Sequence, residues 1–215
     1  MPSIMRMESV LAVGGVAVYP LVALAFIIAV IVLEKTFVLW RRTRLTGPVV
    51  ALVESDGVAW DELRAGVAAL GPRNYFARFF DVLLEYRRRP AWWVESRAAD
   101  EASLIEKSLG RWLWVLETTV TAAPLLGLLG TIIGMVRAFH LFGANGLVNP
   151  SGVTGGVAQA LVATALGLFI ALIALFAFNF FAQRQAQIMD EMERFGTRLV
   201  DRIRLEQDGA HHEAA

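Results

Sequence analysis

The residues best suited to do chemistry in this sequence are a few hydroxyl and amide side chains set in long uncharged stretches. Thr118, Thr121 and Thr131 fall in one such stretch, and Gln159 and Thr164 fall in the next. These groups can bond backbone carbonyls and join helices to one another. None of them is ionisable, so if chemistry happens within the membrane, this chain alone does not carry it.

Three stretches are long and apolar enough to position these groups inside a lipid bilayer. A bilayer core of about 30 Å needs about 20 helical residues. The sequence predicts transmembrane helices over residues 9–40, 112–137 and 153–183. The first stretch is longer than the roughly 7–15 apolar residues of a secretory signal and lacks a convincing cleavage site, so we expect it to be retained.

The composition indicates that the rest of the chain lies in water. The sequence is 56% hydrophobic and 19% charged, with a mean hydropathy of +0.54, which is too apolar for a soluble domain and too charged for a chain wholly in lipid. The net charge of zero gives no argument for a nucleic-acid partner. The absence of cysteine excludes disulfides, thiolate metal sites and cysteine nucleophiles.

Two water-exposed helical regions are expected. Residues 41–111 carry mixed charges and helical patterns separated by glycine and proline, which predicts a cytoplasmic helical domain. Residues 184–206 predict an amphipathic helix that continues the third span and packs on that domain. Its apolar face consists of Ile188, Met192, Phe195, Leu199 and Ile203. The fold class is therefore an all-α integral membrane protein with helical cytoplasmic extensions.

The remaining segments are short. Residues 1–8 are expected to form a periplasmic N-terminus, 138–152 a periplasmic loop and 207–215 a disordered tail. The brief link between the second and third spans predicts that they pack as an antiparallel hairpin.

Basic residues near the ends of the spans predict the orientation, because cytoplasmic flanks carry the excess of lysine and arginine. One side has only Arg6 and Arg137, and the other side has the larger set Arg41, Arg42, Arg44, Lys107, Arg111 and Arg184. We therefore expect the N-terminus to lie outside the membrane and the charged domain and C-terminus to lie on its cytoplasmic side.

Small residues in the second and third spans predict close helix packing. Gly130 and Gly134 form one GxxxG pattern, a weak signal alone. Gly127 and Gly167 are expected to help in the packing. Pro124 should kink or loosen its helix, because proline cannot donate a backbone hydrogen bond.

No enzyme constellation is present. The glycines of the second span lack the lysine ending of a nucleotide-phosphate loop, and no paired carboxylates or nucleophile with a positioned base stand out. His211 and His212 are neighbours in the expected tail, where such pairs usually bind nothing specific, so no metal or cofactor is expected.

Two motifs carry a resemblance to a known family. Residues 122–134, AAPLLGLLGTIIG, and residues 157–168, VAQALVATALGL, followed by Asn179, resemble the signature stretches of the MotA/TolQ/ExbB proton-channel family, closest to its ExbB and TolQ branch. The order of span, large cytoplasmic segment, hairpin of spans and tail also matches this branch. The flagellar MotA type is disfavoured because it has four spans.

The resemblance implies a homopentameric ring around two transmembrane helices of a partner similar to ExbD or TolR. In the family, an aspartate on the partner accepts the proton, and the channel subunit offers threonines along the lumen. The resemblance therefore makes Thr164, in the family's ATA-G-L motif, the first candidate to line the ion path. The other candidates are Thr118, Thr121, Ala122 and Thr131.

The sequence departs from the family pattern at two places. Ala122 stands where the family commonly has a threonine, and Gln159 stands where ExbB and TolQ often have a glutamate. Gln159 lies about 140° around the helix from Thr164, so we expect it to be a subunit contact. Both changes remove polar or ionisable groups from the expected path.

Two functions remain open from the sequence. The first is an ion-driven stator that couples the proton motive force to work on an envelope system. The second is a scaffold that anchors a complex and passes no ion. The sequence does not distinguish H⁺ from Na⁺ or identify the machine that is driven.

Overall fold

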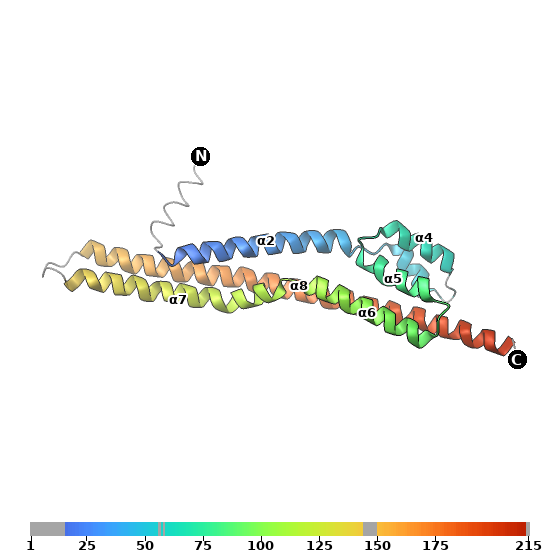
Figure 1. The fold of residues 1–215 in the computed structure, drawn as a ribbon. Helices are drawn as coiled ribbons and strands as arrows, with labels where there is room; N and C mark the ends of the chain where they lie inside the picture. Colours follow the sequence, from blue (N-terminus) through green and yellow to red (C-terminus); the bar gives the residue numbers. More distant parts are fainter. Residues whose placement is uncertain (1–15, 56, 58, 144–149, 214–215) are drawn as a thin grey trace. The chain divides into compact units, whose positions relative to one another are not determined.

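Helices make up the regular structure of the described chain (Figure 1). The computed structural model describes residues 16–55, 57, 59–143 and 150–213, and no strand occurs among them, which confirms the expected all-α fold. The helices are α2 Val18–Arg42, α3 Gly47–Glu54, α4 Trp60–Leu70, α5 Tyr75–Tyr86, α6 Ala91–Gly110, α7 Leu113–Gly143 and α8 Pro150–Glu213.

Three helical segments are long and apolar enough to cross a membrane. They are Val18–Arg42, Ala91–Phe139 and Thr154–Gly209, which confirms the expected three spans. The chain divides into two compact units. Unit 1 comprises Met1–Leu33 and Trp112–Phe180, and unit 2 comprises Glu34–Arg111 and Phe181–Ala215.

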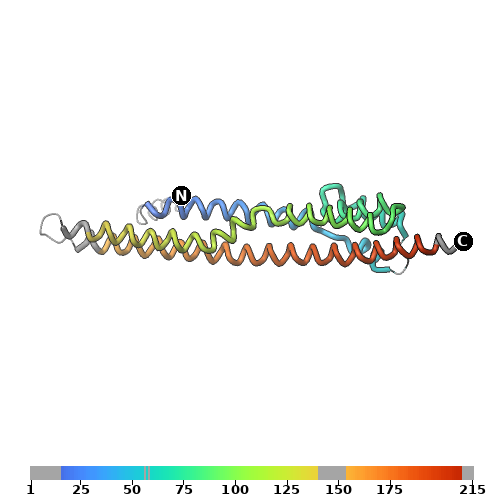
Figure 2. The backbone as a smooth tube through the Cα atoms, turned by 60° about the horizontal axis from the view of Figure 1, so that its bottom comes forward, coloured from blue at the N-terminus to red at the C-terminus, as the bar shows by residue number. Residues whose placement is uncertain are grey.

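Unit 1 is organised by α7 and the first part of α8, which lie side by side in both views (Figures 1 and 2). Gly167 of α8 lies beside Ala123 of α7, and Gly156 of α8 lies beside Ala138 of α7. Residue numbers therefore rise along one helix as they fall along the other. The two helices form the antiparallel hairpin that the short link predicts.

Unit 2 has an apolar core to which α3, α4, α5, α6 and the C-terminal part of α8 all contribute. Aromatic rings form its centre. The rings of Phe76 and Phe80 are 6.3 Å apart, and the rings of Phe80 and Phe195 are 6.1 Å apart. The apolar face of α8 that begins at Ile188 is buried in this core, against residues of α3 to α6.

Asn74 fixes the start of α5. Its Oδ1 accepts hydrogen bonds from the backbone N–H of Phe76 at 2.9 Å and of Ala77 at 3.3 Å, as expected of an N-cap. Its Nδ2 donates to the carbonyl of Arg44 at 2.6 Å. One buried side chain therefore ties the segment after α2 to the helix that supplies most of the aromatic core.

Some segment boundaries differ from those expected from the sequence. Helix α7 continues to Gly143 and α8 begins at Pro150, so both helices extend into the range 138–152 where a loop was expected. Residues 138–142 contain no glycine or proline, so their sequence does not oppose a helix. Residues 144–149, like the expected N-terminus 1–8 and the start of the first span, lie outside the described residues.

The end of the chain also differs from expectation. Helix α8 continues to Glu213, whereas a disordered tail was expected from residue 207. Gln207 donates from Nε2 to the carbonyls of Arg87 at 3.4 Å and Arg89 at 2.7 Å. These contacts hold the last turns of α8 on unit 2, which the local sequence does not indicate.

Candidate functional site

The second and third spans pack closely because glycine lies where the two backbones meet. A methyl group built on Gly167 would lie 2.5 Å from the carbonyl oxygen of Ala123. One built on Gly127 would lie 3.0 Å from the carbonyl oxygen of Ala163 and 3.0 Å from Cα of Thr164. These neighbours are backbone atoms that cannot turn away, so a methyl group at Gly167 would force the two helices apart and one at Gly127 would crowd them.

The GxxxG pair continues this contact toward the end of α7. A methyl group on Gly134 would lie 2.9 Å from Cβ of Ala160, and one on Gly130 would lie 2.6 Å from Cβ of Ala163. Gly130 also faces Ala17, at 2.9 Å from its Cβ. Gly130 therefore lets the residue before α2 and a residue of α8 approach α7 at one place.

Thr164 connects the two helices by a hydrogen bond. Its Oγ1 donates to the carbonyl of Gly127 at 3.1 Å, and the side chain is half-buried at the edge of the helix contact. A bond of this kind, from a threonine hydroxyl to a backbone carbonyl, is what the sequence predicts if the threonines join helices to one another. A hydroxyl oxygen has two lone pairs, so the bond leaves the Thr164 oxygen able to accept from water or an acid.

Two of the other expected path residues share the exposed face of α7. Thr118 and Thr121 are both exposed, and Thr121 donates to the carbonyl of Thr118 at 2.9 Å. Ala122 is half-buried beside them. The structure therefore brings these three together near the start of α7, and it places Thr164 farther along, beside Gly127.

Thr131 lies one helical turn beyond Gly127 and donates to the carbonyl of Leu128 at 2.6 Å. Gln159 is half-buried on α8, on a different side of the helix from Thr164. The expected polar set thus forms two groups within unit 1. Thr118, Thr121 and Ala122 form the first, and the second is arranged around Gly127.

Pro124 lies inside α7, and the helix is continuous through it. Because proline has no N–H, the carbonyl of Val120 loses its usual partner within the helix. This carbonyl lies one turn before Pro124, within the first polar group, between Thr118 and Thr121 in the sequence.

Unit 1 contains few ionisable groups. In its described residues, 16–33, 112–143 and 150–180, the acidic and basic charges are Glu117 and Arg137. Glu117 is exposed, directly before Thr118 and one turn before Thr121. Glu117 was not among the path residues expected from the sequence. The described residues hold no cluster of metal ligands.

One buried polar residue of unit 2 was missed from the sequence. Lys35 is only 3% exposed, and its Nζ donates to the carbonyl of Leu109 at 2.5 Å. Leu109 belongs to the last turn of α6, where carbonyls lack partners within the helix. The position of Lys35 directly after the apolar stretch could have indicated a buried lysine. Its partner could not be predicted, because Leu109 is 74 residues away in the sequence.

Comparison with known proteins shows which family the chain resembles in sequence. Residues 73–194 match the model of the MotA/TolQ/ExbB proton channel family. The chain is 32% identical over 180 residues to biopolymer transport protein ExbB-like 3 of Synechocystis sp., covering 78% of this chain and 81% of the relative. It is 30% identical over 200 residues to ExbB-like 1 of the same organism, covering 86% and 74%.

A third relative matches the chain over a shorter region. The chain is 39% identical over 80 residues to biopolymer transport protein ExbB of Aquifex aeolicus, covering 37% of this chain and 54% of the relative. The chain therefore spans about half the length of that relative. The matched family consists of channel and stator subunits rather than enzymes. This chain is a multi-pass membrane protein that belongs to the MotA/TolQ/ExbB proton channel family, on its ExbB-like side.

Proposed function

We propose that the chain is the ring-forming stator and ion-channel subunit of a motor of the ExbB-ExbD or TolQ-TolR type. Five copies surround the transmembrane helices of two partner chains that resemble ExbD or TolR. The assembly couples the proton motive force to mechanical work on an envelope system for transport or integrity. Family membership supports this proposal, since the relatives are biopolymer transport proteins of the ExbB type.

The observation that carries the proposal is a polar but uncharged hairpin. Thr164 and Thr131 offer hydroxyl groups near Gly127, and the described part of unit 1 has no acid or base between Glu117 and Arg137 on α7 and none on α8. Such a hairpin can hydrate a charge without carrying one. The moving charge is therefore a carboxylate of the partner, and Thr164 lines its path together with Thr118, Thr121, Ala122 and Thr131.

The energetics support this division of work. One charge that crosses 100 mV releases about 2.3 kcal/mol. A bare charge at the centre of a bilayer costs at least about 2.5 kcal/mol by the mildest measure. The driving force alone cannot move an unsolvated carboxylate through hydrocarbon, so hydroxyl groups along the path must lower that cost.

The assembly lies in the bacterial inner membrane, with the N-terminus in the periplasm and unit 2 in the cytoplasm. The distribution of basic residues supports this orientation, because Arg41 and Arg42 end α2 and Lys107 lies in the last turn of α6. The cytoplasmic domain comprises residues 41–111 together with 184–206. Gln159 contacts the neighbouring copy of the chain.

A non-conducting scaffold is the second candidate function. The observation in its favour is that Thr121, Thr131 and Thr164 all donate to backbone carbonyls. In a scaffold these hydroxyls only stabilise the helices and their contact.

Substitution of Thr164 separates the two functions. Thr164→Val keeps the shape of the side chain and removes the hydroxyl, whereas Thr164→Ser keeps the hydroxyl. Proton flux should be measured in vesicles that contain the chain and its single-span partner that resembles ExbD or TolR. For a stator, Val lowers the flux about tenfold or more, the size of one lost hydrogen bond to a charged group, and Ser retains most of it.

For a scaffold, neither variant changes the proton flux. The interhelical hydrogen bond alone is worth about 0.6 kcal/mol on average, so both variants should still assemble. Equal flux in the wild type, Thr164→Val and Thr164→Ser would contradict the ion path through Thr164.

A further inference from the structure

A groove runs along unit 2 between α6 and the C-terminal part of α8. Its volume is about 640 Å³, and it is partly open to solvent. It is lined by residues of both helices and by Phe79 of α5. A methyl group on Gly196 would lie 2.8 Å from Cζ of that ring, so α8 lies directly against α5 there.

The floor of the groove consists of small or apolar side chains. They are Ala98, Ala99 and Ala102 of α6, and Met192, Gly196 and Val200 of α8. Small side chains on both walls leave a trench rather than a flat face. This shape suits a slim peptide segment better than the broad surface of another folded domain.

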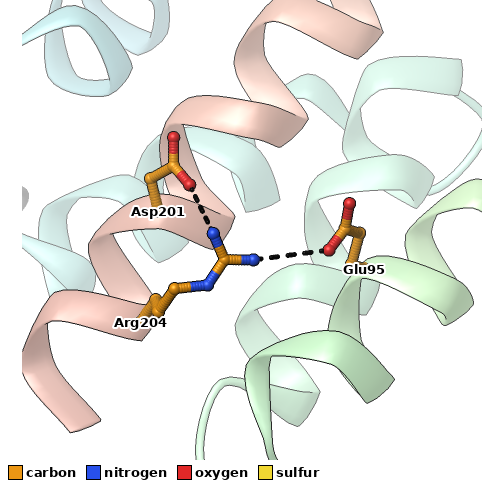
Figure 3. Close-up of polar contacts among 3 residues, drawn as sticks. All are labelled: Glu95, Asp201 and Arg204. Atoms are coloured by element: carbon orange, nitrogen blue, oxygen red, sulfur yellow. Dashed lines mark hydrogen bonds and ion pairs between the residues drawn. The ribbon is translucent and has the colours of Figure 1, made fainter. Parts of the chain in front are cut away.

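Four carboxylates lie along the rim, and one cation lies among them. The carboxylates belong to Glu95, Glu106, Glu193 and Asp201, and the cation is Arg204. Figure 3 shows Arg204 between two of the carboxylates: its guanidinium is 3.1 Å from Asp201 and 3.5 Å from Glu95. Arg204 therefore offers little positive charge to anything else.

The other two carboxylates belong to Glu106 and Glu193. In the residues that the structure describes, neither of them forms an ion pair. Both side chains are exposed. The groove thus combines an apolar floor with an excess of negative charge, which complements a segment that carries lysine or arginine next to small apolar residues.

We infer that this groove binds the basic cytoplasmic segment that flanks the membrane span of the single-span partner. The inference rests on the proposed function, which supplies the partner and places unit 2 in the cytoplasm. The cytoplasmic flank of a membrane span carries the excess of lysine and arginine. That flank therefore has the charge that the rim lacks, and it leaves the membrane on the same side as the groove.

Site-specific photo-crosslinking in the intact membrane complex tests this contact. The photoreactive residue p-benzoylphenylalanine replaces Ala99, which is exposed and lines the groove, or Ala65, which is exposed on α4 outside it. Position 99 should crosslink to the cytoplasmic segment of the partner, as identified by mass spectrometry of the crosslinked peptide. Position 65 should not.

Charge reversal tests the electrostatic part. The double variant Glu106→Lys/Glu193→Lys places like charges opposite the segment, so the crosslink from position 99 should fall about tenfold or more. The matched control is Asp190→Lys/Glu191→Lys, which reverses two exposed charges of α8 that do not line the groove. The control should leave the crosslink yield unchanged.

Co-purification of the partner separates failure of this inference from failure of the proposed function. If the partner co-purifies and position 99 crosslinks to a second copy of this chain or to nothing, the groove assignment is wrong and the stator proposal stands. An equal fall in both charge-reversed variants also overturns the assignment. If no single-span partner co-purifies at all, the proposed function fails, and the inference fails with it.

Discussion

At the scale of single residues, Lys35 and Thr164 show two uses of a polar group in an apolar setting. Each donates to a backbone carbonyl of another helix: Lys35 to Leu109 and Thr164 to Gly127. The ammonium group of Lys35 meets the C-terminal end of α6, where the helix dipole favours a positive charge. The hydroxyl of Thr164 lies in the middle of a hairpin, where an uncharged donor avoids the cost of burying a charge.

Substitution of Lys35 tests its contribution to stability. Lys35→Met keeps much of the apolar volume but leaves the buried carbonyl of Leu109 without its donor. We expect the free energy of unfolding to fall by about 1–3 kcal/mol, the cost of one unsatisfied buried group. Thermal unfolding in detergent measures the change.

Lys107 provides the control for this substitution. It lies in the last turn of α6 but is exposed, so Lys107→Met should change stability by no more than about 0.5 kcal/mol. If both variants unfold at the temperature of the wild type, the Lys35 contact does not stabilise the fold.

At the scale of helices, the contact between α7 and α8 depends on glycine. Gly167→Ala places a methyl group 2.5 Å from the carbonyl oxygen of Ala123. The helices must then move apart, and we expect a loss of about 1–3 kcal/mol. The unfolding midpoint in detergent is the measurement.

Gly155→Ala is the matched control on the same helix, because a methyl group there meets no atom within 4 Å. Alanine also has a higher helix propensity than glycine, so this variant should be as stable as the wild type or more so. A stable Gly167→Ala variant, with the spectrum and midpoint of the wild type, would show that the two backbones are not in close contact.

The C-terminal part of α8 should depend on Phe195 for its attachment. This side chain is 1% exposed in the core of unit 2, and Phe195→Ala should cost about 3–5 kcal/mol. Limited proteolysis should then cut α8 faster within its last turns. Leu205→Ala changes a side chain that is 65% exposed and should leave the cleavage rate unchanged; equal rates in both variants would contradict the packing.

The sequence could predict the features of these helices that depend on local patterns. Long apolar stretches predict spans, and the spacing of Ile188, Met192 and Phe195 predicts the buried face of α8. The sequence could not predict which carbonyl Thr164 or Lys35 contacts, because those partners are 37 and 74 residues away. The extent of α8 likewise depends on the long-range contacts of Gln207.

The candidate site was predictable only in part for a related physical reason. Residue type and helical spacing identify the threonines and the small residues of the hairpin. They do not specify which faces of α7 and α8 meet, because that depends on where the two backbones approach most closely. Glu117 was not expected along the path, because a charged residue at the end of a span is also common where its side chain only meets water.

At the scale of the whole molecule, the proposed function needs more than one chain. The described hairpin contains hydroxyl groups but no acid or base between Glu117 and Arg137, so one copy has no group that can carry a proton through the centre of the membrane. Exposed apolar residues on the same helices, such as Leu125 and Phe176, are available to meet lipid or other copies. A ring around a partner that carries a carboxylate supplies what the single chain lacks.

The most direct test of this account is the composition and pore of the assembled particle. The chain should be purified together with its single-span partner, and the complex should be examined by native mass spectrometry and electron cryomicroscopy. The account predicts five copies around two single-span partners, with Thr164 facing the partner's transmembrane carboxylate. A ring with no partner inside, or one in which Thr164 faces lipid and the centre is lined by apolar side chains alone, would contradict it.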